Sequence, residues 1–192
     1  MIIVTGGAGF IGSNFILKFL EASNENLLNL DNLSYAANLS NLKAIDSDPR
    51  YSFSKINIQN QSEVEEIVKE VKPRAILNFA AESHVDRSIE GPESFINTNI
   101  LGTYSLLEAA LNYWNDLDEN GKKIFRFFHI STDEVFGSLD INDKKSTEES
   151  SYKPNSPYSA SKAASDHLVR AWYHTFKLPT LVSNCTNNYG PH

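Results

Sequence analysis

The feature that most constrains the fold is a glycine-rich turn placed between an apolar strand and a helix. The apolar run Met1–Thr5 leads into Gly6-Gly-Ala-Gly-Phe-Ile-Gly12, and a helical pattern of apolar residues follows through Leu20. Glycine lets a turn adopt positive φ, and the free N–H groups that open the next helix attract a phosphate. A strand, a turn and a helix in this order are typical of a dinucleotide-binding βαβ unit.

The same alternation continues along the chain. Short apolar runs that suit buried parallel strands begin near Leu27, Tyr51, Ala75, Phe125 and Pro179. Helical patterns separate most of these runs, which predicts an α/β fold: a Rossmann-like doubly wound parallel sheet in three layers, α/β/α. The ligands of such sheets bind at the carboxyl ends of the strands. We expect residues 1–192 to form one domain.

Four longer segments between the strands have distinct patterns. Two long helices are expected, at Pro92–Tyr113 and Pro157–Phe176. The segments Ala80–Gly91 and Ser138–Asn155 are polar and are expected to be loops.

Asp31 ends the second predicted strand. A carboxylate at this point can accept hydrogen bonds from both hydroxyls of a ribose, and it repels a 2′-phosphate. The alternative is a solvated carboxylate at a strand end, which the spacing from the glycine turn disfavours. Gly6, Gly9, Gly12 and Asp31 therefore predict an NAD site rather than an NADP site.

Tyr158 and Lys162 stand one helical turn apart on the second long helix. An ammonium beside a phenol favours the phenolate, which can remove a hydroxyl proton while hydride leaves the same carbon. A lone pair of this kind is more often an ordinary feature of a helix surface. Its place after a dinucleotide motif favours a catalytic base.

Thr132, Asp133 and Glu134 follow the fifth predicted strand. Two adjacent carboxylates in different environments can serve as an acid and a base in one site, and the Thr132 hydroxyl can bind a substrate oxygen. The alternative is a solvated acidic turn. The position at the ligand edge of the sheet favours the catalytic interpretation.

The composition limits the classes of partner that the chain is expected to bind. A net charge of −7 argues against a general nucleic-acid or membrane-surface binder. The single cysteine, Cys185, fits a reducing compartment, and the first residues show no leader pattern, so we expect a cytoplasmic protein. The five histidines are scattered along the chain, and no metal site is expected.

Longer motifs carry a family resemblance. Thr5–Gly12 together with Tyr158 and Lys162 resembles the extended short-chain dehydrogenase/reductase family. Ala80-Ala-Glu-Ser-His-Val-Asp-Arg-Ser88, Ser131-Thr-Asp-Glu-Val-Phe-Gly137 and Asn184-Cys-Thr-Asn-Asn-Tyr-Gly-Pro191 resemble the sugar-nucleotide 4,6-dehydratases within it. The resemblance implies a lyase of deoxysugar biosynthesis that uses NAD and acts on dTDP-glucose. It also implies a homodimer formed through the two long helices.

The resemblance implies a role for each catalytic residue. Tyr158 would remove the proton of the glucose 4-hydroxyl, Glu134 would take the C5 proton, and Asp133 would protonate the departing C6 hydroxyl. Thr132 would hold the sugar 4-oxygen, while Lys162 would hold the nicotinamide ribose and tune Tyr158.

The same resemblance implies the binding contacts. The residues that would contact NAD, besides the glycines, Tyr158 and Lys162, are Phe10, Ile11, Asp31, Asn32, Leu33, Ser34, Asn57, Ile58, Ala80, Ala81, Glu82, Ser83, Thr98 and Asn188. Ser83 and Asn187 would touch the substrate together with Thr132. Asn57 stands where the family usually has Asp, and an amide can still hydrogen-bond to adenine.

The chain departs from the family in length. Family members continue into a smaller C-terminal domain that binds the nucleotide of the substrate, and we expect that domain to be absent from these 192 residues. Two alternatives therefore stay open. One is an NAD-binding fragment without catalytic competence, and the other is a different epimerase or dehydratase of sugar nucleotides.

Overall fold

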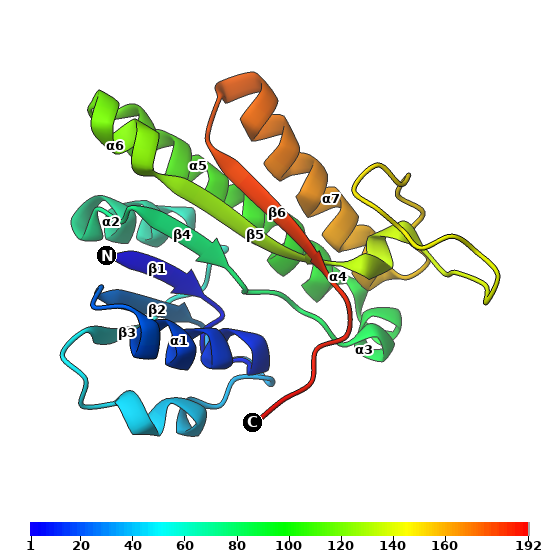
Figure 1. Ribbon diagram of the computed structural model, residues 1–192, viewed down its shortest axis with the longest axis horizontal. Coiled ribbons are helices and arrows are strands. Elements are labelled where there is room, and N and C mark those ends of the chain that lie inside the picture. Colours follow the sequence, from blue (N-terminus) through cyan, green and yellow to red (C-terminus); the bar gives the residue numbers. More distant parts are fainter. Residues whose placement is uncertain (192) are drawn as a thin grey trace.

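The computed structural model describes residues 1–191 and contains one six-stranded parallel sheet (Figure 1). The strands are β1 (Ile2–Thr5), β2 (Leu27–Asp31), β3 (Tyr51–Lys55), β4 (Ala75–Asn78), β5 (Arg126–Thr132) and β6 (Thr180–Cys185). Their order is β3-β2-β1-β4-β5-β6, with each neighbouring pair parallel. The order reverses direction between β1 and β4, which creates the crevice where such sheets bind ligands. The predicted Rossmann-like sheet is confirmed.

Helical segments connect the strands. They are α1 (Phe10–Ala22), η1 (Leu39–Ile45), α2 (Gln61–Val71), α3 (Val85–Glu90), α4 (Pro92–Phe95), η2 (Ile96–Gly102), α5 (Thr103–Asn115), α6 (Glu119–Ile124), η3 (Asp133–Phe136), α7 (Pro157–Ala171) and η4 (Trp172–Phe176). Within residues 1–191, no helix combines the length and the apolar character needed to cross a bilayer.

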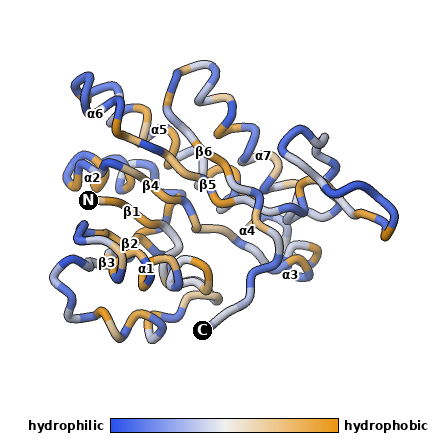
Figure 2. The backbone as a smooth tube through the Cα atoms, viewed as in Figure 1, coloured by the Kyte–Doolittle hydropathy of each residue, from blue (hydrophilic) through white to orange (hydrophobic). Residues whose placement is uncertain are grey.

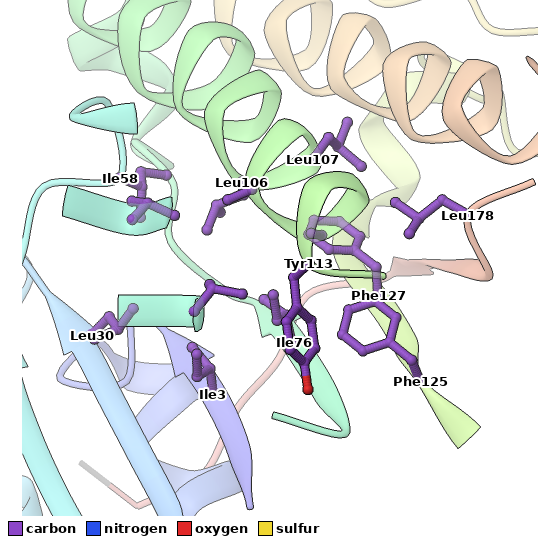
Figure 3. Packing of buried hydrophobic residues seen from close by; sticks show 14 of the residues in the cluster. Ile3, Leu30, Ile58, Ile76, Leu106, Leu107, Tyr113, Phe125, Phe127 and Leu178 are labelled. Atoms are coloured by element: carbon purple, nitrogen blue, oxygen red, sulfur yellow. The ribbon is translucent and has the colours of Figure 1, made fainter. Parts of the chain in front are cut away.

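Alternate residues of each strand face opposite layers. On one face, Ile3, Ile76 and Phe127 are fully buried beneath α2, α5 and α7. Figure 3 shows Leu106 of α5 directed toward the strand side, whereas Leu107 lies on the side of α5 that faces α7. Each buried aliphatic or aromatic side chain of this size contributes about 1.5–3 kcal/mol to folding.

The opposite face is packed by α1 and η1. Ile2, Val4 and Leu77 contact Ile16 of α1 and its neighbours in a second buried cluster. In Figure 1, α1 covers the β1–β3 half of the sheet, and within residues 1–191 no helix lies over β6 on this face. Leu181 of β6, whose register partner Phe128 packs with this second cluster, is accordingly 53% exposed.

Figure 2 shows where the polar segments lie. Hydrophobic residues follow the strands and the inner helix faces, while the segment between η3 and α7 is largely hydrophilic. This segment contains the predicted loop Ser138–Asn155. The other predicted loop, Ala80–Gly91, differs from the prediction because its second half forms α3.

Candidate active site and cofactor cleft

A cleft of about 260 Å³ opens at the carboxyl ends of the strands, across the β1–β4 reversal. The predicted cofactor residues that line it are Gly6, Gly9, Phe10, Ile11, Gly12, Asp31, Asn32, Ser34, Ile58, Ala80, Ala81, Glu82, Ser83, Thr98, Tyr158 and Lys162. Leu33, Asn57 and Asn188 are not in its lining. Strands, loops and α7 thus bring residues far apart in sequence to one concave surface.

The cleft also has lining residues that the sequence analysis did not assign. They are Leu30, Ala36, Ala37, Ile56, Phe79, Ile130 and Ser131. Most are apolar residues at strand ends. An apolar residue there can either pack in the core or contact a ligand, and the sequence pattern does not distinguish the two. Only the position at the carboxyl end of a strand could have indicated these residues.

The glycine turn leaves no room for a side chain at Gly6 or Gly12. Gly6 has φ +68°, and a Cβ there would come within 2.5 Å of the Ala80 nitrogen. A Cβ on Gly12 would clash with the Gly6 carbonyl oxygen. Gly9 precedes α1 without any side-chain cap, so the first N–H groups of that helix face the cleft. This cradle suits a pyrophosphate, which needs close backbone approach and free amide donors.

Asp31 is buried at the end of β2, with only 7% of its surface exposed. Its Oδ2 accepts a hydrogen bond from Ala8 N at 2.9 Å, and its Oδ1 accepts one from Leu33 N at 2.8 Å. These bonds fix the carboxylate at the cleft wall and leave further lone pairs on both oxygens. Leu33, which has φ +58°, shapes this wall through its backbone rather than through its side chain.

Tyr158 and Lys162 lie on the cleft wall because α7 begins at a fixed point. Ser156 caps α7 in a capping box with Ser159, and Pro157 occupies the first helical turn. Tyr158 lies in this first turn and Lys162 one turn later, and both are buried on the side of α7 that packs against β5.

The pKa of Tyr158 is raised to about 12, chiefly by burial and further by the Glu134 and Asp133 carboxylates. A hydrogen bond with the Thr132 hydroxyl lowers the pKa of Tyr158 in part. The prediction that Lys162 favours the phenolate stays a prediction. The Lys162 ammonium donates a hydrogen bond to the Ile130 carbonyl oxygen at 2.8 Å. Burial lowers the pKa of Lys162 to about 8.

Thr132 ends β5, and Asp133 and Glu134 open the single turn η3. The Thr132 hydroxyl accepts a hydrogen bond from Glu134 N at 3.2 Å, so the turn holds the three residues together. Burial, followed by the charge of Asp133, raises the pKa of Glu134. A higher pKa makes a carboxylate a stronger base. Glu134 also lines a smaller hollow with Gly137, Ser138, Asn155, Ser156 and Ser159.

Two predicted residues, Asn187 and Asn188, are not among the residues that line the cleft. Asn187 and Asn188 are exposed on the coil after β6, and Asn188 Nδ2 donates to Thr186 O at 3.0 Å. This coil returns toward α1 (Figure 1), where Asn14 Nδ2 donates to Pro191 O at 2.8 Å. The coil therefore runs from the β6 side of the cleft to its glycine side.

Comparisons with known proteins agree with this geometry. Residues 3–192 match the family described as GDP-mannose 4,6 dehydratase. A dTDP-glucose 4,6-dehydratase from Haemophilus influenzae is 52% identical over 189 residues, which is 98% of this chain and 56% of that protein.

Two solved structures have the same fold. The dTDP-glucose 4,6-dehydratase DesIV from Streptomyces venezuelae, solved with NAD bound, superimposes with a TM-score of 0.90 and 42% identity over 99% of this chain. The dTDP-glucose 4,6-dehydratase from Bacillus anthracis, solved in complex with NAD, gives a TM-score of 0.86 and 43% identity, also over 99% of this chain. This chain covers 56% of each of those chains, so it spans about half the length of the relatives it matches.

Proposed function

This chain belongs to the GDP-mannose 4,6-dehydratase family, and from that premise we propose that it carries the cofactor site and catalytic groups of an NAD-dependent dTDP-glucose 4,6-dehydratase. The observation that carries the proposal is the pair Asp133 and Glu134, which a single turn holds beside the buried Tyr158 at the ligand edge of the sheet. A reaction that removes water needs such an acid and base near the oxidising centre. The relatives named above support dTDP-glucose as the substrate.

The residues of the cleft fit NAD. The side-chain-free cradle at Gly6 and Gly12 suits the pyrophosphate, and the fixed carboxylate of Asp31 suits an unphosphorylated ribose. When bound, NAD supplies the acceptor for the C4 hydride and the donor that returns it to C6. Titration with NADH and NADPH, followed by nicotinamide fluorescence, tests this assignment. Binding of NADPH as tight as that of NADH would contradict the role of Asp31.

The chain's own residues then have separate tasks. Thr132 binds the sugar 4-oxygen, and Tyr158 takes the proton of the 4-hydroxyl. The resulting 4-ketone acidifies the C5 proton, which Glu134 removes, and Asp133 protonates the departing 6-hydroxyl. The raised pKa of Glu134 strengthens it as the base for this step. Ser83, on the cleft lining, and Asn187 complete the substrate contacts.

Removal of the Asp133 and Glu134 carboxylates tests the proposed dehydratase activity. In the protein that contains these residues, the double variant Asp133→Asn with Glu134→Gln should form 4-keto-6-deoxy sugar from dTDP-glucose at least ~10³-fold more slowly, because general acid and base each contribute about 10²–10⁴-fold. The binding of NADH should be unchanged. An epimerase would keep its activity nearly intact in this variant. UDP-glucose and GDP-mannose serve as substrate controls.

A second candidate is that these 192 residues bind NAD without turning over the substrate. The observation that favours it is that the chain spans about half the length of its relatives. Binding energy from parts of a substrate remote from the reacting atoms supports catalysis, and the part of the relatives that this chain does not span would supply it. A polypeptide of residues 1–192 should then bind NADH and convert dTDP-glucose negligibly. Rapid conversion by that polypeptide would exclude this candidate.

We also propose a homodimer and a cytoplasmic location. Ile96, Leu101 and Tyr104 on η2 and α5 are 38–51% exposed, and Tyr173 and Phe176 on η4 are about half exposed. Tyr104 contacts Trp172 edge-on at 5.9 Å, which joins the two groups into one apolar surface. Such a surface favours a second copy of the chain. The free Cys185 fits a reducing compartment.

A further inference from the structure

A row of polar side chains lies beneath α5 and α7 and crosses three adjacent strands. Asn78 of β4 is the register partner of Thr5 on β1 and of His129 on β5, and all three side chains are buried. The Thr5 hydroxyl donates to Asn78 Oδ1 at 2.7 Å, and Asn78 Nδ2 lies 3.1 Å from His129 Nδ1. Asn78 Nδ2 is a donor, so His129 Nδ1 accepts and a neutral His129 carries its proton on Nε2.

The row ends at Asp166, one helical turn after Lys162 on α7. His129 Nε2 lies 3.5 Å from Asp166 Oδ1 and 3.5 Å from Lys162 Nζ, so the imidazole stands between the carboxylate and the ammonium. All three side chains are at least 97% buried. A buried carboxylate and a buried ammonium are both costly unless they compensate each other.

The other oxygen of Asp166 is held from three directions. Oδ2 accepts from Ser131 Oγ at 2.8 Å, from the Tyr152 hydroxyl at 2.9 Å and from Asn184 Nδ2 at 3.3 Å. These donors come from β5, from the loop before α7 and from β6. Three donors to one carboxylate oxygen stabilise its ionised form. None of the steps of the proposed reaction uses this residue.

We propose that Asp166 is a positioning residue that acts through Lys162: its fixed buried carboxylate, with His129 between, keeps the Lys162 ammonium charged beside the cofactor cleft. The role of Lys162 toward NAD rests on the proposed function, whereas the coupling between Asp166 and Lys162 does not. Through Asp166, the hydrogen bonds from β5, from β6 and from the loop at Tyr152 support the positive charge of Lys162.

The charges that face Lys162 agree with this assignment. Burial lowers the pKa of Lys162, while Asp166 on α7 and then Cys185 on β6 raise it. His129 on β5 adds no positive charge, because burial and then Lys162 hold its pKa well below the usual value. Burial raises the pKa of Asp166, and the Ser131 hydrogen bond and then the Lys162 charge act against that rise.

The test is a direct titration of Lys162 in the 192-residue chain, without substrate. With lysine labelled with ¹³C at Cε, the signal lost in Lys162→Arg identifies the residue, and its chemical shift is followed from pH 6 to 11. We expect Asp166→Asn to lower the pKa of Lys162 by about 1 or more. Tyr152→Phe, which removes one donor but no charge, should change it by less than ~0.3. An unchanged Lys162 pKa in Asp166→Asn would overturn the proposal.

A reciprocal measurement covers the case in which Asp166→Asn does not fold. Coupling between two sites is mutual, so loss of the Lys162 charge must raise the pKa of Asp166. With carboxyl-labelled aspartate, Lys162→Met should show Asp166 titrating at higher pH than in the wild-type chain. The same Asp166 pKa in both proteins would overturn the coupling. Neither measurement involves turnover, so failure of the dehydratase assay leaves both results interpretable.

Discussion

At the residue scale, steric exclusion and burial explain most of the site. Gly12 is required because the Gly6 carbonyl oxygen occupies the place of a side chain, and Gly91 is not constrained in this way, since its nearest contact for a Cβ is Arg87 O at 3.9 Å. The same residue type therefore has different consequences at the two positions. Only the contacts distinguish them.

Gly12→Ala should lower the free energy of unfolding by about 1–3 kcal/mol, because the turn must move away from the added methyl group. The displaced amides should also weaken the binding of NADH. Gly91→Ala is the matched control and should change both quantities little. Thermal unfolding and NADH fluorescence measure them, and equal effects of the two substitutions would contradict the steric explanation.

Lys162 predicts a pH dependence of stability. Its pKa is about 8 in the folded chain and near 10.5 when unfolded, so the unfolded chain binds more protons between these values. The free energy of unfolding contributed by Lys162 therefore rises as the pH increases from about 8 to about 10.5. Urea unfolding at several pH values should show this rise in the wild-type chain relative to Lys162→Met. If the difference in the free energy of unfolding between the two proteins does not change with pH, this prediction is wrong.

At the scale of elements, the start of α7 decides where the catalytic side chains lie. The capping box of Ser156 and Ser159 fixes the first turn, and Tyr158 and Lys162 follow on the buried side. The sequence predicts a helix from Pro157, but the direction of its buried face depends on α5 and β5, which pack against it. In the same way, the long helix predicted from Pro92 is present, yet its middle, η2, is a π-helix that no local pattern indicated.

Ser156→Ala should destabilise the chain by about 1 kcal/mol, because the Ser159 amide loses its acceptor at the N-terminus of α7. Ser151→Ala, on the exposed loop before α7, is the control and should have little effect. Thermal unfolding compares the two. Since Tyr158 lies in the same turn, the rate of any turnover should fall with Ser156→Ala and not with Ser151→Ala.

At the scale of the whole molecule, the sheet has one well-covered half and one open edge. The apolar surface formed by η2, α5 and η4 lies on helices of one layer, and Leu181 of β6 is exposed on the other face. Of these two surfaces in residues 1–191, the first is continuous across several helical segments, which is why the proposed dimer contact is assigned to it.

Leu101→Asp should shift the proposed dimer to monomer, because a carboxylate would be buried without a partner in the apolar contact. Ile141→Asp is the control: Ile141 is fully exposed and lies on the loop after η3. Light scattering coupled to size-exclusion chromatography gives the mass of each. A monomeric wild-type chain, or a dimer in both variants, would contradict the assignment.

The sequence by itself determined the fold class, the position of the glycine turn and the strand-end clusters, because these depend on local periodicity, on backbone freedom and on residues adjacent in the chain. Asp31 and the Tyr158–Lys162 pair were found for the same reason. The tertiary structure alone decided the direction of the Tyr158 pKa and the role of Asp166. Both depend on burial and on charges from separate strands: Thr5, Asn78 and His129 form one row only because β1, β4 and β5 are neighbours. Register across a parallel sheet is a non-local property, and spacing along the chain does not encode it.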